Sequence, residues 1–164
     1  MTSKIFQGRL IAIGGNEDRA NELVVLKRVV EEIGKANFKV AVITTASEEP
    51  EKRGEDYDKV FTTLGAAKIE ILNIKERSQA NDSSLARKLD DVDMIFLAGG
   101  DQLRLTTIIG GSKILRAINK RLQTGVLIAG TSAGAAVFSD TMIYEGKSKE
   151  GLFKGKVLTT SGFG

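Results

Sequence analysis

Ser132 lies at the centre of a run of small residues whose pattern suits nucleophilic chemistry. Residues 126–134 read Val-Leu-Ile-Ala-Gly-Thr-Ser-Ala-Gly, an apolar run that leads into a Gly-x-Ser-x-Gly turn. The apolar run suits a buried strand, and the alanines that follow suit the start of a helix. A serine on such a sharp strand-to-helix turn is the nucleophile elbow of serine hydrolases. The alternative is an ordinary turn in which Ser132 caps the helix.

Two backbone amides are candidates for an oxyanion hole beside Ser132. The amide of Ala133 opens the expected helix, where the helix N-terminus favours negative charge. The segment Gly99-Gly100-Asp101-Gln102 follows another apolar run, and its glycines let a backbone amide approach a substrate closely. The alternative for this segment is a strand-to-helix turn with Asp101 as the cap.

A third glycine-containing segment, Gly14-Gly15-Asn16-Glu17-Asp18, follows the first apolar run. It is not a dinucleotide-binding fingerprint, because the later glycine of G-x-G-x-x-G is missing. Its alternative interpretation is helix capping by Asn16 or Asp18.

Strand-length apolar runs alternate along the chain with helical patterns, as in βα units. The expected strands are Leu10–Ile13, Val40–Ile43, Ile69–Ile74, Met94–Leu97 and Val126–Ala129, and the expected helices include an amphipathic segment around Leu26–Ile33, then Glu55–Leu64, Ser84–Leu89 and Ile114–Leu122. This order predicts an α/β fold with a doubly wound, mostly parallel sheet and no internal domain boundary. Ligands of such sheets bind outside the carboxyl ends of the strands, so we expect the three glycine-containing loops to converge at one edge.

Composition excludes several kinds of site. The chain has 164 residues, a net charge of +3 and 5% aromatic residues, which is weak support for nucleic-acid binding. It contains no cysteine and no histidine, so disulfides and thiolate metal sites are excluded and zinc catalysis is disfavoured. No apolar run is long enough for a membrane span. We therefore expect a soluble, cytoplasmic protein without a metal or another cofactor.

The chemically suggestive segments together resemble the cyanophycinases. The resemblance rests on Gly14–Asp18, Phe96–Arg104, Ala129–Ala136 and Ser139–Ile143, and it extends over most of the chain. Cyanophycinases belong to a serine peptidase family that also includes aspartyl dipeptidases, with a fold similar to class I glutamine amidotransferases. The Gly-Gly-Asp-Gln loop and the segment from Ser139 favour the cyanophycinase branch. The substrate that this implies is cyanophycin, a polyaspartate with arginine on each side chain, and the product is the β-aspartyl-arginine dipeptide.

The resemblance also assigns roles to individual residues. It makes Ser132 the nucleophile, places the amides of Gly100 and Ala133 in the oxyanion hole, and assigns Gln102 to substrate binding. Asp101 belongs to the same substrate-binding loop, where shaping the loop is its expected role.

The absence of histidine is the main departure from the family pattern. In that family the histidine and its acidic partner lie further along the chain, so we expect residues 1–164 to be the N-terminal portion of one hydrolytic domain, completed by further residues or a second chain. A further strand is expected to begin at Val157-Leu158, with an unpaired edge and exposed apolar surface. A serine–lysine pair is an alternative source of the base, and its candidates are Lys147, Lys149, Lys154 and Lys156.

Two further functions stay open at this level. One is an aspartyl dipeptidase, which would act on short peptides instead of a polymer. The other is a non-catalytic binding domain with an amidotransferase-like fold, which the missing histidine favours. The exposed sheet edge and the family resemblance also suggest a homodimer.

Overall fold

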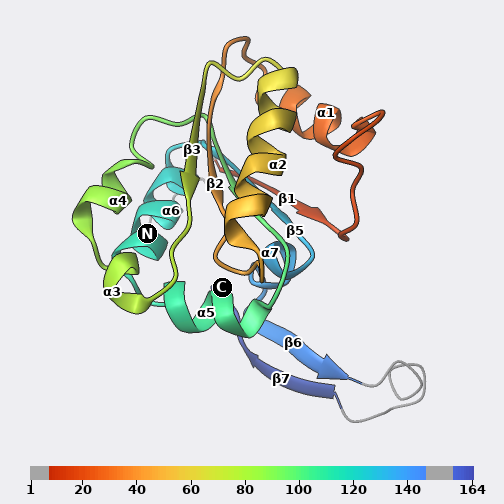
Figure 1. The fold of residues 1–164 in the computed structure, drawn as a ribbon. Coiled ribbons are helices and arrows are strands. Elements are labelled where there is room, and N and C mark those ends of the chain that lie inside the picture. Colours follow the sequence, from red (N-terminus) through yellow and green to blue (C-terminus); the bar gives the residue numbers. More distant parts are fainter. Residues whose placement is uncertain (1–7, 147–156) are drawn as a thin grey trace, which may run out of the picture.

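The computed structural model describes residues 8–146 and 157–164, and its centre is a parallel five-stranded sheet (Figure 1). The strand order is β1-β5-β4-β2-β3, and each neighbouring pair is parallel. The strands are β1 (Arg9–Ile13), β2 (Lys39–Ile43), β3 (Lys68–Leu72), β4 (Met94–Leu97) and β5 (Leu127–Thr131). All five predicted strands are therefore present; β4 has the predicted bounds, and the ends of the others differ from the prediction by at most two residues.

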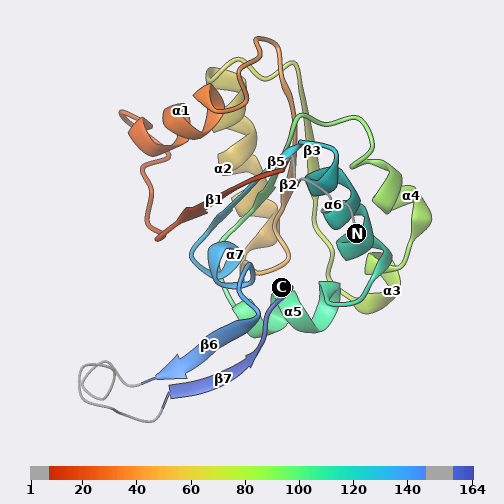
Figure 2. The same cartoon turned by 180° about the vertical axis from the view of Figure 1, so that it is seen from behind.

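Helices cover both faces of this sheet, as Figures 1 and 2 show from opposite sides. One face packs against α1 (Val24–Glu31) and α2 (Pro50–Thr63). The other face packs against α3 (Arg77–Ala80), α4 (Ser83–Arg87), α5 (Gln102–Ile109), α6 (Lys113–Gln123) and α7 (Ala133–Ala136). The predicted doubly wound α/β fold is confirmed.

The continuous apolar runs are explained by burial on both faces. In β2, Val40 and Val42 join the core beneath α1 and α2, whereas Ala41 and Ile43 join the core on the opposite face. Successive side chains of a strand point to opposite sides, so a strand covered on both sides needs apolar residues at every position.

Helix boundaries depend on local capping. The helix α2 begins at Pro50, five residues before the prediction, because proline is well suited to the first helical turn. The helix α6 begins after Ser112, whose hydroxyl accepts a hydrogen bond from the Leu115 amide at 3.2 Å. The helices α3 and α5 were not predicted as separate elements, although the alternative for Asp101 included a helix start.

A hairpin of β6 (Thr141–Gly146) and β7 (Val157–Ser161) extends away from the central sheet (Figures 1 and 2). The strand predicted at Val157 is thus confirmed, but it pairs antiparallel with β6 and not with the sheet. Ile143, Val157 and Leu158 are exposed on this hairpin, in agreement with the apolar surface expected there. Among the described residues, no helix is long and apolar enough to cross a membrane.

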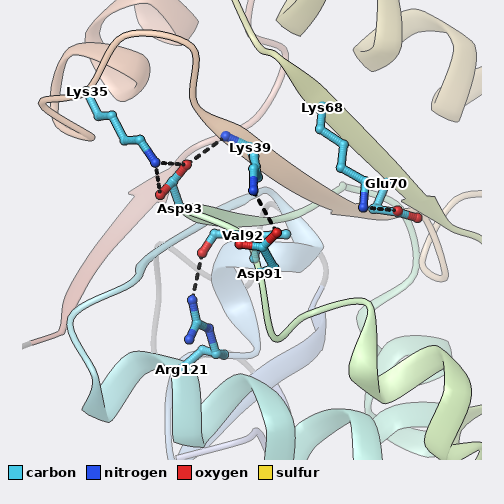
Figure 3. Close-up of polar contacts among 8 residues, drawn as sticks. All are labelled: Lys35, Lys39, Lys68, Glu70, Asp91, Val92, Asp93 and Arg121. Atoms are coloured by element: carbon cyan, nitrogen blue, oxygen red, sulfur yellow. Dashed lines mark hydrogen bonds and ion pairs between the residues drawn. The ribbon is translucent and has the colours of Figure 1, made fainter.

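Ion pairs and hydrogen bonds gather at the amino ends of the strands (Figure 3). The carboxylate of Asp93, just before β4, accepts hydrogen bonds from the Lys39 amide at 2.8 Å and from the Lys35 ammonium at 3.0 Å. Nearby, Arg121 of α6 donates to the Val92 carbonyl at 2.8 Å. These contacts connect the start of β2 with the start of β4 at the sheet edge opposite the glycine-containing loops.

The Asp93 contacts should make folding stability depend on pH. Partial burial alone would raise the pKa of Asp93, but the Lys39 amide and the Lys35 ammonium outweigh it and hold the pKa below its usual value. A lowered carboxyl pKa adds stability above the unfolded pKa, and that stability is lost as the pH falls through the folded value. We expect Asp93→Ala to cost about 1.5 to 3 kcal/mol at pH 7.

Urea denaturation at several pH values measures this cost, with Asp91→Ala as the control. Asp91 pairs with the Lys39 side chain but is largely exposed, so its loss should cost less stability than the loss of Asp93. The cost of Asp93→Ala should shrink as the pH falls below about 4, where the unfolded carboxyl begins to protonate. A cost that stays constant down to pH 2 would contradict this account.

Candidate active site

Ser132 occupies a strained turn between β5 and α7. Its backbone angles are φ 51° and ψ −114°, and a positive φ of this kind is uncommon for a residue with a side chain. Such a conformation costs about 1 to 3 kcal/mol and persists only where the surroundings enforce it. The Ser132 amide donates a hydrogen bond to the carbonyl of Ile13 in β1 at 2.9 Å, while the residue itself is exposed. The turn is thus held against β1 and presents its hydroxyl at the surface.

The two glycines of the Gly-x-Ser-x-Gly pattern permit close packing below Ser132. A β-carbon on Gly130 would lie 2.2 Å from the Gly134 carbonyl oxygen. A β-carbon on Gly134 would lie 2.2 Å from the carbonyl oxygen of Leu97, at the end of β4. No side chain fits at either position, so both glycines are required for β5, α7 and β4 to meet.

The other two glycine-containing loops also reach Ser132. A β-carbon on Gly15, after β1, would lie 3.0 Å from Cβ of Ser132, and one on Gly99, after β4, would lie 3.2 Å from the same atom. The predicted convergence of the three loops at the carboxyl edge of the sheet is therefore confirmed.

The two candidate oxyanion amides lie on these loops. Gly100 has φ 147°, and a β-carbon there would lie 1.9 Å from the Ala46 carbonyl oxygen, which also accepts a hydrogen bond from the Asp101 amide. Within the described residues, neither the amide of Gly100 nor that of Ala133 donates a hydrogen bond, whereas the adjacent amide of Ser132 does. Both amides are available as donors, and their role in an oxyanion hole stays a prediction.

Asp101 and Gln102 make contacts within the protein. The Asp101 carboxylate caps α5 by accepting hydrogen bonds from the amides of Leu103 at 2.8 Å and Arg104 at 3.1 Å. The Gln102 side chain donates to the carbonyls of Ile143 at 3.3 Å and Tyr144 at 3.4 Å, both in β6. These contacts shape the loop and position the hairpin. Neither residue lines the cavity at Ser132, and their contact with a substrate stays a prediction.

A cavity of about 390 Å³ opens beside Ser132. Its lining combines the three predicted loops with the loop after β2 and one side of α2. The lining residues are Asn16, Glu17, Arg19, Ser47, Glu48, Glu49, Arg53, Tyr57, Gly99, Gly100, Thr131 and Ser132. The contributions of the β2 loop and α2 were not predicted, because the charge-rich residues Glu48–Lys59 are typical of a solvated loop and the start of a helix. Its position directly after a buried strand was the available signal.

Glu17 is a buried residue in the lining of this cavity. Its carboxylate accepts hydrogen bonds from the hydroxyls of Tyr57 and Thr131, each at 2.5 Å, and from the Arg19 guanidinium at 3.0 Å. Burial alone would raise the pKa of Glu17, but the hydrogen bonds from Thr131, Tyr57 and Arg19 outweigh it, so the pKa lies below its usual value. Glu17 is therefore ionised at neutral pH.

The described residues give no indication of a metal site. Within residues 8–146 and 157–164, no group of three acidic side chains is arranged to hold a metal ion. The candidate lysine bases (Lys147, Lys149, Lys154 and Lys156) lie outside the described residues.

A parallel sheet with helices on both faces and an exposed serine at the carboxyl ends of its strands defines an α/β protein of the flavodoxin and glutamine amidotransferase type. The chain belongs to peptidase family S51, whose profile it matches over residues 10–159. It is 36% identical over 156 residues to a cyanophycinase of Trichormus variabilis and 33% identical over 156 residues to a cyanophycinase of Geminocystis herdmanii. These alignments cover 94% of this chain but 52% and 57% of the relatives. The chain thus spans about half the length of the curated relatives it matches.

A solved structure shares the fold. The crystal structure of a peptidase from an acI-B1 actinobacterium superposes with a TM-score of 0.72 at 25% identity, over 96% of this chain and 64% of that one. The predicted resemblance to the family is confirmed by both sequence and fold.

The loop at Gly100 offers a direct test of the close packing at the site. We expect Gly100→Ala to destabilise the fold by at least about 2 kcal/mol, because the new β-carbon meets the Ala46 carbonyl and the backbone is left-handed. Gly14→Ala is the matched control, since nothing lies within 4 Å of its β-carbon position. The free energy of unfolding of the Gly14→Ala variant should be unchanged or about 0.4 to 1 kcal/mol higher than that of the wild type. Urea denaturation of both variants measures the difference, and equal stabilities would refute the close approach.

Proposed function

We propose that residues 1–164 carry the nucleophile and oxyanion hole of a serine peptidase that acts on cyanophycin. The observation that carries this proposal is the exposed Ser132 on a strand-to-helix turn with positive φ, the geometry expected of a nucleophile elbow. On adjoining loops, the amides of Gly100 and Ala133 donate no hydrogen bond within the described residues. Family membership and the names of the relatives support it.

In the proposed reaction, Oγ of Ser132 attacks the scissile carbonyl carbon and forms a tetrahedral intermediate. The amides of Gly100 and Ala133 donate hydrogen bonds to the oxyanion, and each such donor is typically worth about 2.7 to 4 kcal/mol. Collapse of the intermediate expels the amine and leaves an acyl-enzyme, which water hydrolyses.

The proton of Ser132 needs an acceptor that the described residues do not identify. The 164 residues contain no histidine, and the relatives are about twice as long as this chain. We propose that the histidine base and its acidic partner lie outside these positions, in the same polypeptide or in a second chain, and that residues 1–164 form part of one hydrolytic domain.

The charge pattern of the cavity supports a substrate with both acidic and basic groups. Arg19 and Arg53 contribute positive charge to its lining, and Glu48 and Glu49 contribute negative charge. Cyanophycin carries carboxylates and guanidinium groups, so it can find partners of both kinds there. Release of β-aspartyl-arginine dipeptides is the proposed outcome.

Oligomeric state and location stay predictions. A homodimer would cover apolar side chains such as Ile143, Val157 and Leu158 on the exposed hairpin. A cytoplasmic location is proposed from the sequence alone.

The role of Ser132 can be tested in the 164-residue chain and in the complete coding sequence that contains it. We expect the 164-residue chain to show little or no hydrolysis because it lacks the base, and the complete protein to cleave cyanophycin. Ser132→Ala should reduce that activity by at least about 10³-fold. Ser139→Ala is the matched control, because Ser139 bonds only to the Ala136 carbonyl among the described residues.

Full activity of the 164-residue chain would refute this proposal, as would an active Ser132→Ala variant. A fluorophosphonate probe separates catalysis from the alternative of a non-catalytic binding domain. Labelling of Ser132 in the complete protein supports a nucleophile, whereas a complete protein that the probe never labels supports the binding domain.

Substrate choice distinguishes the two peptidase activities. We expect the complete protein to release β-aspartyl-arginine from cyanophycin with a kcat/KM at least about 10-fold higher than for α-aspartyl dipeptides, because the cavity carries partners for both charges of the polymer. Parallel assays of the two substrates by amine release measure the ratio. The reverse preference would establish the aspartyl dipeptidase alternative.

A further inference from the structure

Glu17 is a buried carboxylate whose contacts span three elements around the nucleophile. Its side chain is 1% exposed. One oxygen accepts hydrogen bonds from Tyr57 of α2 and from Arg19, and the other accepts from Thr131 at the end of β5. All four residues line the same cavity as Ser132.

The negative charge of Glu17 holds Arg19, Tyr57 and Thr131 around it. A buried carboxylate is costly unless hydrogen-bond donors surround it, and here three donors satisfy both of its oxygens. Burial and the charge of Glu17 raise the pKa of Tyr57 above its usual value, so its hydroxyl stays protonated and donates. The arrangement is therefore complete only while Glu17 is ionised.

Thr131 connects Glu17 to the nucleophile. It immediately precedes Ser132, and its backbone pairs with Ile13 of β1, whose carbonyl also accepts the Ser132 amide. The Thr131 side chain is fixed by Glu17 at 2.5 Å. The peptide before Ser132 is thus held by the backbone pairing of Thr131 and by its side chain, and a strained positive φ persists only where the surroundings enforce it.

Arg19 connects Glu17 to the open part of the cavity. Its guanidinium lies 5.8 Å from the centre of the Tyr57 ring, and its side chain is 29% exposed. A guanidinium has five N–H donors, and Glu17 is its hydrogen-bond acceptor among the described residues. An adjoining cavity of about 250 Å³ is lined by the same Arg19, by Lys52 and Arg53, and by Glu49 and Asp56, the carboxylates that pair with those two cations. Donors of Arg19 that Glu17 does not use are therefore available to an anionic ligand, whereas Lys52 and Arg53 are paired with Glu49 and Asp56.

We propose that Glu17 is a positioning residue with two separable effects: through Thr131 it orients Ser132 for attack, and through Arg19 it presents a guanidinium to a carboxylate of the substrate. This inference rests on the proposed role of Ser132. It identifies the group next to the scissile bond as one that carries a free carboxylate, for which Arg19 is the receptor.

The two effects predict different kinetic changes in the complete protein. Thr131→Val removes the hydroxyl at nearly constant volume and should lower kcat about 10-fold with KM within twofold, while Thr131→Ser should restore kcat. Arg19→Met should raise KM about 10-fold with kcat within twofold. Glu17→Gln should change both, because an amide cannot hold Arg19 by charge.

Glu70→Gln is the matched control for loss of a partly buried, ion-paired carboxylate. Glu70 lies on β3, the outermost strand on the side of the sheet away from β1. It pairs with Lys68 at 2.8 Å and with Lys88 at 3.1 Å, and Figure 3 shows the Lys68 pair. The Glu70→Gln variant should have a lower thermal stability than the wild type and an unchanged kcat and KM. If Glu17→Gln behaves in the same way, or if Thr131→Val keeps the wild-type kcat, Glu17 has only a structural role and the inference is wrong.

A different result would show that the proposed function itself is wrong. If the wild-type complete protein neither hydrolyses cyanophycin nor reacts with a fluorophosphonate, Ser132 is not a nucleophile and the effect through Thr131 is refuted with it. Calorimetric titration with β-aspartyl-arginine then tests the effect through Arg19 alone. Weaker binding to Arg19→Met and Glu17→Gln, by about 10-fold, supports it, and unchanged or absent binding refutes it.

Discussion

The structure depends on the close approach of three strand ends around Ser132. The ends of β1, β4 and β5 meet at distances where a β-carbon on Gly15, Gly99 or Gly130 would crowd a neighbouring atom. This contact lets the Ser132 amide reach the carbonyl of Ile13 and enforces a backbone conformation that an isolated serine would avoid. Small residues at this edge are therefore a condition for the exposed hydroxyl, because any larger side chain would separate the strands.

The amino ends and the carboxyl ends of the strands have different roles in the structure. At the amino ends, Asp93 ties the start of β2 to the start of β4 through Lys35 and Lys39, and these contacts are ordinary ion pairs and hydrogen bonds. At the carboxyl ends, the amides of Gly100 and Ala133 donate to no partner within residues 8–146 and 157–164, and charged side chains line an open cavity. Between the edges, apolar side chains bury both faces of every central strand. The packed interior gives the carboxyl edge a rigid base, so strain can be stored there without loss of the fold.

The electrostatics of the cavity follow from one buried charge. Glu17 is held ionised by Tyr57, Thr131 and Arg19, which belong to segments far apart in the chain. Glu17 contacts one nitrogen of the Arg19 guanidinium, and the Arg19 side chain is 29% exposed, so part of that group still faces solvent. A cavity with fixed charges of both signs suits a substrate whose side chains also carry both, which links the electrostatics to the proposed polymer substrate.

The sequence by itself determined the parallel α/β fold, the order of its strands along the chain and the turn at Ser132, because these features are encoded by local periodicity and by glycine spacing. It also indicated which loops converge, since parallel strands place their carboxyl ends at one edge. Only the tertiary structure decided which side chains meet. The bond from Thr131 to Glu17 spans 114 positions and that from Tyr57 to Glu17 spans 40. Likewise, β7 pairs with β6 and Gln102 donates to β6, not to the cavity. Such contacts depend on strand register and helix placement over long separations, and no short sequence pattern records either.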